Sequence, residues 1–450
     1  MGALASKETF FQGKAVALLL LVAIALRIPI FFLTHANNDE IVYTNLAMKL
    51  DTYGLKTFTD QYNNFYVNLK YHDSTLELIP SEEKITSFSR AVSLGLGLEN
   101  EILSHHPPGF SFFLALSHQI LCKDKPYILL SKKHPGPGID SMQFYATVVP
   151  FIFSLLLIVS TYLLGRMLFS AKIGLWAAFI IALTPTDLLT AQKIWADDMV
   201  AFFGLATIML YLLSLKKDQL IYAALAGLSC GIAILGKMSG GFIALAIILF
   251  HFYKNKELIL TRKIYTILLE RRMIVFLAFS LICVLPWLVA LKNNFGLKTF
   301  FLQFEPVIRQ AQQFPEGFIK TVHSRPLLTY LVTIPYQFPL YFLGYFSFIS
   351  LLAKGRNREN VVFLCIWYGI TLILLTLRQD KEERYILPAL PALALLSAIS
   401  LNNLKITIET QGRKYLWFGI YLFLFLSIYW ACRIGMLYVF ERADIIPIPY

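Results

Sequence analysis

The chain has 450 residues, of which 57% are hydrophobic and 15% are charged, and its mean hydropathy is +0.61. Soluble domains carry about 25% charged residues, so this composition excludes an ordinary soluble protein. A net charge of +12 would indicate nucleic-acid binding in a soluble protein. In a membrane protein, lysine and arginine kept at the cytoplasmic helix ends explain it, so we expect no nucleic-acid partner. The five cysteines show neither a disulfide framework nor metal-ligand spacing.

Apolar segments of about 20 residues, long enough to cross a bilayer, recur along the chain. Every backbone polar group must be paired inside hydrocarbon, so these segments are expected to be helices. The fold class predicted from them is an all-α polytopic membrane protein with about eleven transmembrane helices. The predicted spans are roughly 14–34, 143–166, 172–191, 198–215, 219–235, 240–253, 273–291, 327–353, 360–377, 385–401 and 415–437.

Two long polar stretches interrupt the spans, and loops of such length usually carry function. Residues 35–141 and 292–326 are predicted to be extracytoplasmic loops of one transmembrane module, 1–450, with no C-terminal soluble domain. The apolar stretch 107–122 begins with two prolines and is too short to span, so we expect an interfacial helix. The basic stretches, of which 254–272 is the strongest, then share the side of the N-terminus, which we predict to be cytoplasmic.

This topology gathers unusual polar residues at the extracytoplasmic face of a plasma or inner membrane. Each has an ordinary explanation when taken alone. Paired acids at 39–40 and 197–198 could cap helices, because the helix dipole favours carboxylates there, and Lys237 could snorkel to the interface. Arg27 lies inside the first span, where a charge is costly, so it either snorkels outward or pairs with a carboxylate of that face.

Taken together, these residues fit the transfer of a sugar from a lipid phosphate. Such a reaction needs a carboxylate to accept the proton of the attacking group, and Asp39 and Asp197 are the candidates. It also needs positive charge where the phosphate leaves. Arg309, Lys381 and Arg384 are the candidates for that role, since a guanidinium fork matches phosphate. Mg²⁺ or Mn²⁺ would bind carboxylates, but no closed ligand set is visible and the metal is left open.

Four short motifs follow one another in order along the chain. They are Asp39-Glu40-x-x-Tyr43, His106-Pro107-Pro108-Gly109-Phe110, Asp197-x-x-x-x-Phe202-Phe203 and Arg384-Tyr385-x-x-Pro388-x-x-Pro391. They resemble motifs of the GT-C class of membrane glycosyltransferases, in the branch of protein O-mannosyltransferases and the lipid A aminoarabinose transferase. Weaker likenesses are a glycine-rich segment that ends at Lys237, and a stretch that holds Glu305, Arg309 and His323.

The resemblance implies a GT-C fold and an inverting glycosyltransferase. Its donor would be a polyprenyl- or dolichyl-phosphate sugar, and its acceptor a glycan, a lipid or a protein. Asp39 corresponds to the family's catalytic base, Asp197 to its second aspartate, and Arg309 to an arginine that contacts lipid phosphate. Substrate binding is expected of the remaining candidates: Glu40, Tyr43, His106, Asp198, Lys237, Glu305, His323, Lys381, Arg384 and Tyr385.

The chain departs from the family in the spacing of its first two motifs. About 67 residues separate Asp39 from His106, more than the resemblance predicts. The added stretch, near 61–100, matches no family element and is interpreted as a lid or an acceptor site. His106 also follows the mannosyltransferases, since the aminoarabinose transferases have lysine at that position.

Two other classes of function compete with a transferase. A transporter or lipid-linked-sugar flippase would place its charges near the bilayer midplane and often shows inverted repeats. Here the polar residues cluster at helix ends and no repeat is visible. A non-catalytic assembly or sensor protein would tolerate substitution of the carboxylates.

Overall fold

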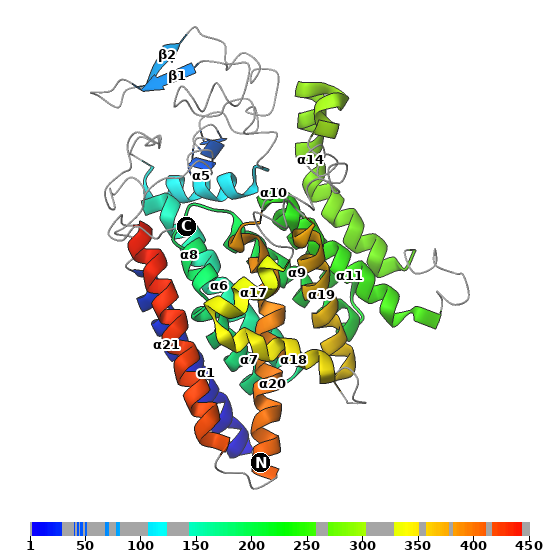
Figure 1. Cartoon of the computed structure of the whole chain (residues 1–450). Helices are drawn as coiled ribbons and strands as arrows, with labels where there is room; N and C mark the ends of the chain where they lie inside the picture. The colour runs from blue at the N-terminus through cyan, green and yellow to red at the C-terminus, as the bar shows by residue number, and fades with distance from the viewer. Residues whose placement is uncertain are drawn as a thin grey trace.

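The protein is a bundle of long helices (Figure 1), which confirms the predicted all-α polytopic fold class. The computed structural model describes residues 2–28, 40, 43–44, 46–47, 50–51, 68–71, 78–81, 107–123, 144–257, 269–302, 328–350, 357–377, 381–410 and 416–442. The described part holds two short strands, β1 (Asn68–Tyr71) and β2 (Leu78–Ser81), which pair antiparallel outside the bundle.

Among the described residues, six helical segments are long and apolar enough to cross a membrane. They lie in α6 (Phe144–Leu168), α9 (Asp197–Lys217), α14 (Arg271–Leu302), α19 (Arg358–Thr376), α20 (Leu390–Thr410) with the 3₁₀ turn η6 (Glu383–Ala389), and α21 (Leu416–Arg442). Shorter apolar helices are α5 (Gly109–Leu121), α7 (Ala171–Ala182), α10 (Leu220–Gly236) and α11 (Gly241–Lys254), which the 3₁₀ turn η4 (Met238–Gly240) precedes. These lengths do not confirm the predicted number of about eleven spans.

Proline divides two segments that the hydropathy predicts as single spans. The predicted span 172–191 is α7 followed by the short helix α8 (Pro185–Thr190), and the predicted span 327–353 is α17 (Thr329–Gln337), η5 (Pro339–Tyr341) and α18 (Phe342–Ser350). Thr184 and Phe338 each precede a proline and are extended. The proline ring disfavours the helical region for the residue before it, so each helix ends there.

Close packing of α10 on α14 depends on two glycines. A Cβ atom added to Gly227 would lie 2.4 Å from the Phe276 carbonyl oxygen, and one added to Gly231 would lie 2.4 Å from the Cys283 Cβ. Glycines four residues apart allow two helix backbones to approach closely in this way. The glycine-rich segment before Lys237 is therefore explained by packing between these helices. Deeper in the bundle, α20 packs against α7, α18 and α19, and it is buried over residues 390–399.

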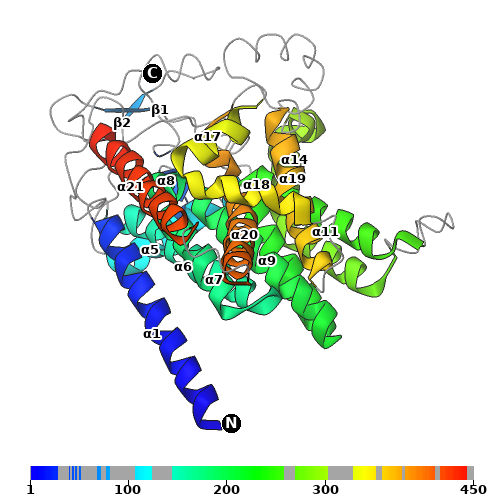
Figure 2. The same cartoon turned by 60° about the horizontal axis from the view of Figure 1, so that its bottom comes forward.

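Helices α9 and α10 run antiparallel, as do α9 and α14, because the start of one lies beside the end of the other, so the bundle has two distinct ends. One end, called here the basic end, holds the Lys254–Glu359, Arg272–Asp218 and His251–Glu270 ion pairs, together with the start of α1 (Gly2–Arg27). The N-terminal half of α1 stands apart from the other helices (Figure 2). The basic helix ends thus share the side of the N-terminus, as the charge pattern predicts.

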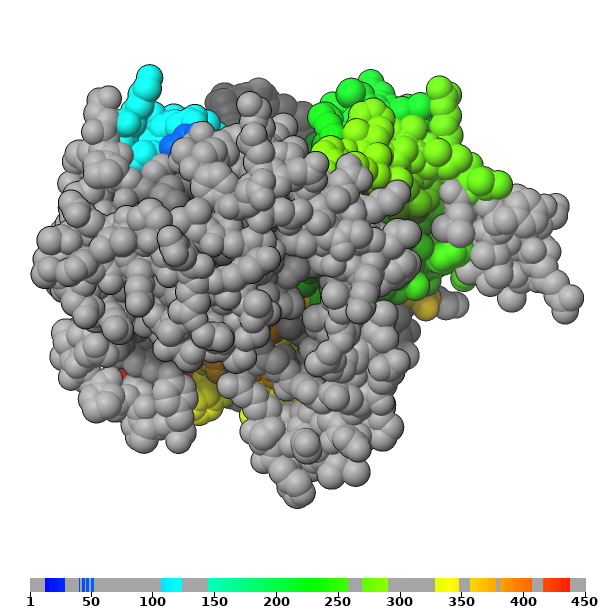
Figure 3. Space-filling model, turned by 90° about the horizontal axis from the view of Figure 1, so that it is seen from above, coloured from blue at the N-terminus to red at the C-terminus, as the bar shows by residue number. Residues whose placement is uncertain are grey.

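The opposite end, called here the site end, is crossed by α5. This helix runs over the ends of the long helices rather than alongside them (Figure 1), as expected for the stretch 107–122. Its first residue, Gly109, lies against Leu235 at the end of α10, where an added Cβ would be 2.7 Å from the Leu235 carbonyl. Figure 3 shows the molecule from this end, where α5, in cyan, and part of α14, in light green, lie at the surface.

Candidate active site

A buried carboxylate starts α9 at the site end. Asp197 is the first residue of that helix and is 2% exposed. Lys237 follows directly after α10, and its Nζ donates a hydrogen bond to Asp197 Oδ1 at 2.8 Å. Because α9 and α10 are antiparallel neighbours, the start of one lies beside the end of the other. Two candidates 40 positions apart in the sequence are therefore brought together.

Arg384 adds a second cation to this cluster from η6. Its guanidinium Nη1 lies 4.0 Å from Asp197 Oδ2, and it also forms an ion pair with Glu382. The same guanidinium lies 3.8 Å from the centre of the Trp195 ring, and the Lys237 ammonium lies 4.3 Å from the centre of the Tyr385 ring. Aromatic faces stabilise cations at such distances. The cluster of Asp197, Lys237, Arg384, Trp195 and Tyr385 is called here the cation cluster.

The first motif is held against the segment that leads to Asp197. Glu40 is fully buried, and its Oε1 accepts a hydrogen bond from the Ile194 backbone N–H at 2.9 Å. Tyr43 packs edge-on against Phe110 of α5, and Ser111 Oγ donates to the Tyr43 carbonyl at 2.9 Å. These contacts fix the described part of the first motif between α5 and the start of α9.

The remaining predicted site residues stand as follows. Lys381 is described and buried, two residues before η6 begins. The others lie outside the described residues: Asp39, His106, Glu305, Arg309 and His323. The structure therefore brings together Asp197, Lys237, Arg384 and Tyr385, and attaches Glu40 to the same segment. The role of Asp39 as the catalytic base stays a prediction.

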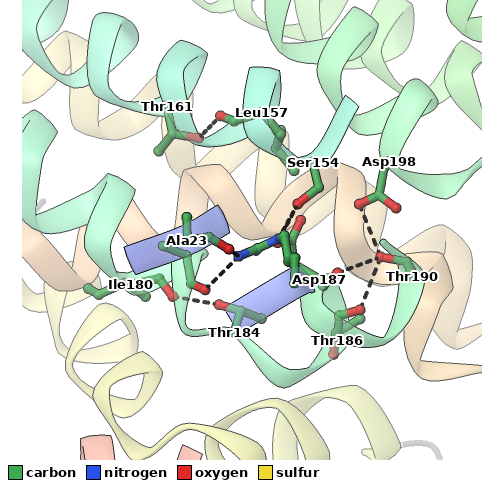
Figure 4. Close-up of polar contacts among 12 residues, drawn as sticks. Ala23, Ser154, Leu157, Thr161, Ile180, Thr184, Thr186, Asp187, Thr190 and Asp198 are labelled. Carbon is green, nitrogen blue, oxygen red and sulfur yellow. Dashed lines mark hydrogen bonds and ion pairs between the residues drawn. The ribbon is translucent and has the colours of Figure 1, made fainter. Parts of the chain in front are cut away.

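A second buried carboxylate, Asp187, is the ion-pair partner of Arg27. Both side chains are fully buried, and the Arg27 guanidinium forms an ion pair with Asp187 of α8. Arg27 Nε donates to Ser154 Oγ at 2.8 Å, and Ser154 Oγ donates to Asp187 Oδ2 at 2.9 Å (Figure 4). Of the two alternatives for this arginine, pairing with a carboxylate is the one that the structure shows. The partner, Asp187, is a residue that sequence reasoning missed.

Asp198 belongs to this second network rather than to the cation cluster. Thr190 Oγ1 donates to Asp198 Oδ1 at 3.0 Å and approaches the Asp187 carbonyl at 3.2 Å (Figure 4). Successive residues of a helix point about 100° apart, so Asp197 and Asp198 enter different surroundings. Substrate binding by Asp198 stays a prediction, and its described contact is to the protein.

Comparison with known proteins identifies the architecture. Residues 98–300 match the family described as dolichyl-phosphate-mannose-protein mannosyltransferase. The undecaprenyl phosphate-alpha-4-amino-4-deoxy-L-arabinose arabinosyl transferase 2 of Proteus mirabilis is 26% identical over 271 residues, 56% of this chain and 44% of the relative. An uncharacterized protein of Aquifex aeolicus is 27% identical over 58% of this chain and 49% of its own length. The chain thus spans about half the length of these curated relatives.

Two solved structures have a similar fold. ArnT from Cupriavidus metallidurans bound to undecaprenyl phosphate has a TM-score of 0.54 at 17% identity, over 86% of this chain and 60% of ArnT. The oligosaccharyltransferase AglB from Archaeoglobus fulgidus, in complex with an inhibitory peptide and a dolichol-phosphate, has a TM-score of 0.56 at 15% identity, over 97% of this chain and 56% of AglB. The chain has the GT-C fold.

The motif positions of this GT-C chain were visible in its sequence, but several partners were not. Glu382, which pairs with Arg384, lies in a charged run where no single residue stands out. Trp195 belongs to the stretch 195–198 that draws attention by its paired acids, but the sequence assigns it no role in the site. Nothing in the sequence singles out Gln192. In the described part of the chain, no three His, Cys, Asp or Glu side chains cluster closely enough to hold a metal ion.

Proposed function

We propose that this GT-C protein transfers a sugar from a polyprenyl- or dolichyl-phosphate donor to a glycan, lipid or protein acceptor. The observation that carries the proposal is the cation cluster, in which Lys237 and Arg384 surround Asp197 at one end of the bundle. The family match and the Proteus mirabilis relative are named for lipid-phosphate-linked sugars, and both structural neighbours hold a polyprenyl-type phosphate. The fold and the charges support the same chemistry.

The reaction requires positive charge at the leaving group, which is the phosphate. The acceptor oxygen attacks the anomeric carbon, the bond from that carbon to the phosphate oxygen breaks, and the phosphate leaves with the bonding electrons. Lys237 and Arg384 would stabilise the charge that grows on the phosphate, since preorganised donors in a buried site act most strongly on charge that develops in the transition state. Arg384 offers a fork that fits two phosphate oxygens.

The acceptor proton goes to Asp39 in this proposal, because the first motif matches the family motif that carries the base. Attack from the face opposite the phosphate inverts the anomeric configuration. Asp197 keeps Lys237 and Arg384 close to each other before the donor binds, because a carboxylate offsets the repulsion between two neighbouring cations. Glu40 would hold the base segment at the site through its hydrogen bond to Ile194 N–H.

The site end would face the extracytoplasmic side of a plasma or inner membrane. Lysine and arginine are retained on the cytoplasmic side of membrane proteins. The basic end holds Lys217, Lys254, Arg271, Arg272 and Arg358, each at a helix terminus. That asymmetry supports a cytoplasmic N-terminus and an extracytoplasmic cation cluster.

Transfer in a defined membrane tests the proposal. Proteoliposomes with the purified protein receive a polyprenyl-phosphate sugar that carries radiolabel in the sugar, with a glycolipid acceptor fraction. We expect label in the acceptor with the wild type and a loss of at least 100-fold with Asp39→Asn, because removal of a general base costs about 10²–10⁴-fold in rate. Equal transfer by the variant would exclude Asp39 as the base. Movement of intact donor across the bilayer without transfer would replace the proposal with a flippase.

A further inference from the structure

The turn between α8 and α9 has buried hydrogen-bonding groups that no described residue of the protein contacts. Gln192 is 2% exposed, and neither its amide oxygen nor its amide nitrogen has a partner among the described residues. Trp195 is 8% exposed, and its indole Nε1 is buried with no acceptor in the described part of the chain. More than about 90% of buried polar groups in proteins are hydrogen-bonded. Three unused atoms within four residues therefore point to a polar ligand.

The backbone of this turn is held in place. Lys193 N–H donates to the Thr190 carbonyl at 3.0 Å, and Ile194 N–H donates to Glu40 at 2.9 Å. Trp195 is further fixed by Arg384, whose guanidinium lies on its ring face. The unused groups thus belong to a rigid segment, and a rigid segment binds a ligand at a low entropic cost.

The turn is continuous with the cation cluster. Trp195 contacts Arg384 and lies two residues before Asp197, while Gln192 lies in the same turn. A group bound by the Trp195 indole edge would therefore lie next to whatever Arg384 binds. In the proposed reaction Arg384 holds the donor phosphate, and the donor sugar is bonded directly to that phosphate.

We propose that Gln192 and Trp195 bind hydroxyl groups of the donor sugar. The inference rests on the proposed transferase function and deepens it by naming residues that select the sugar. An amide carries one acceptor and two donor hydrogens, and an indole carries one donor. A sugar hydroxyl donates and accepts, so it can satisfy all of these groups.

The chemistry disfavours the other parts of the substrate. An ionised phosphate only accepts hydrogen bonds, so it would leave the Gln192 amide oxygen without a donor. A polyprenyl tail would satisfy neither side chain, and burial of an unpaired amide against hydrocarbon is unfavourable. A glycan acceptor shares the hydroxyl chemistry of the donor, and contact with Arg384 places the turn on the donor side.

Sugar selectivity tests the inference. Polyprenyl-phosphate donors that carry mannose, glucose or 4-amino-4-deoxyarabinose are compared in the proteoliposome assay, and the best donor is then compared with analogues that each lack one hydroxyl. Gln192→Met keeps the length of the side chain and removes its hydrogen bonds, and Trp195→Phe keeps an aromatic face for Arg384 and removes the indole N–H. Gln219→Met, the same change at an exposed position of the basic end, is the matched control.

We expect the wild type and Gln219→Met to reject at least one deoxy analogue by 10-fold or more, and Gln192→Met to accept that analogue as well as the complete sugar. Trp195→Phe should lose discrimination at a different hydroxyl. Inhibition by sugar-free polyprenyl phosphate should be unchanged in both variants, and so should the KM for the acceptor. That pattern supports a donor-sugar site.

Four results would overturn the inference. Wild-type selectivity in both Gln192→Met and Trp195→Phe, with normal folding by size exclusion, would exclude a sugar-selecting role. Weaker inhibition by sugar-free polyprenyl phosphate would place these residues at the phosphate, and a raised KM for the acceptor alone would place them at the acceptor. Absence of transfer by the wild type from every donor would instead overturn the proposed function. In that case, equal thermal stabilisation of the wild type by sugar-bearing and sugar-free lipid would also exclude the sugar site.

Discussion

Two buried carboxylates, Asp187 and Asp197, lie ten positions apart and differ in how they are paired. Asp187 meets Arg27 and Ser154, and both partners of its ion pair are fully buried. Asp197 meets Lys237, whose side chain is 21% exposed, and Arg384 at the longer distance of 4.0 Å. The first centre is fully buried, while the second is partly exposed at Lys237 and adjoins Gln192 and Trp195, whose side-chain polar atoms have no partner among the described residues. Buried charge alone therefore does not mark a functional site.

The difference has an energetic meaning. When one partner of a buried ion pair is removed, an uncompensated charge remains in a medium that solvates it poorly. Substitution of one partner of the fully buried Arg27–Asp187 pair should therefore lower the stability of the protein. The cations of the cation cluster can exchange Asp197 for a charged substrate. Substitutions in that cluster should therefore change the kinetics of sugar transfer. Three predictions separate the two centres.

The largest effect is expected from Arg27→Met. The variant leaves Asp187 charged and buried, and breaking a buried pair typically lowers the free energy of unfolding by about 3–5 kcal/mol. Thermal unfolding of the detergent-solubilised protein should show the loss. In Arg27→Met/Asp187→Leu both charges are gone, and much of the stability should return. A double variant no more stable than the single one would contradict the pairing, and a KM for the donor that changes in the folded fraction would contradict a purely structural role.

Lys237→Met should reverse this pattern. Loss of a preorganised group that stabilises transition-state charge lowers kcat by about 10²–10³-fold, and the partly exposed position should keep the protein folded. Initial rates of sugar transfer, with unfolding temperature measured alongside, check this. Lys217→Met is the matched control, because Lys217 is exposed at the basic end and bonds only Tyr222 among the residues described here. Equal rates for both variants would remove Lys237 from the site.

A smaller effect is expected from Thr190→Val, which keeps the shape of the side chain and removes its hydroxyl. Thr190 donates to Asp198 at 3.0 Å, and a lost hydrogen bond of this kind destabilises by about 0.5–1.5 kcal/mol. Chemical denaturation measures the change. Thr207→Val is the control. It removes a hydroxyl that bonds the Phe203 carbonyl of its own helix, and it should lower the free energy of unfolding by less than Thr190→Val does. A fall in kcat for Thr190→Val without a fall in stability would assign Asp198 to the reaction.

Much of the site was predictable because its chemistry is local. The acidic and basic motif residues mark themselves as charges at the ends of apolar segments, and α5 was predictable from a length too short to span. The breaks at Pro185 and Pro339 were not predicted, although both prolines are visible in the sequence. Hydropathy averages over about 20 residues and is insensitive to one residue that ends a helix, so those spans were predicted too long.

The sequence by itself determined the helical class and the gathering of basic residues at one end of the bundle. Both follow from costs that each segment bears alone, since backbone groups must be paired within hydrocarbon and positive charges stay on one side. Tertiary structure alone decided that Arg27 pairs with Asp187, that Lys237 pairs with Asp197, and that Gln192 has no partner among the described residues. Such partners lie up to 160 positions apart, so only the packing of whole helices determines which of them meet.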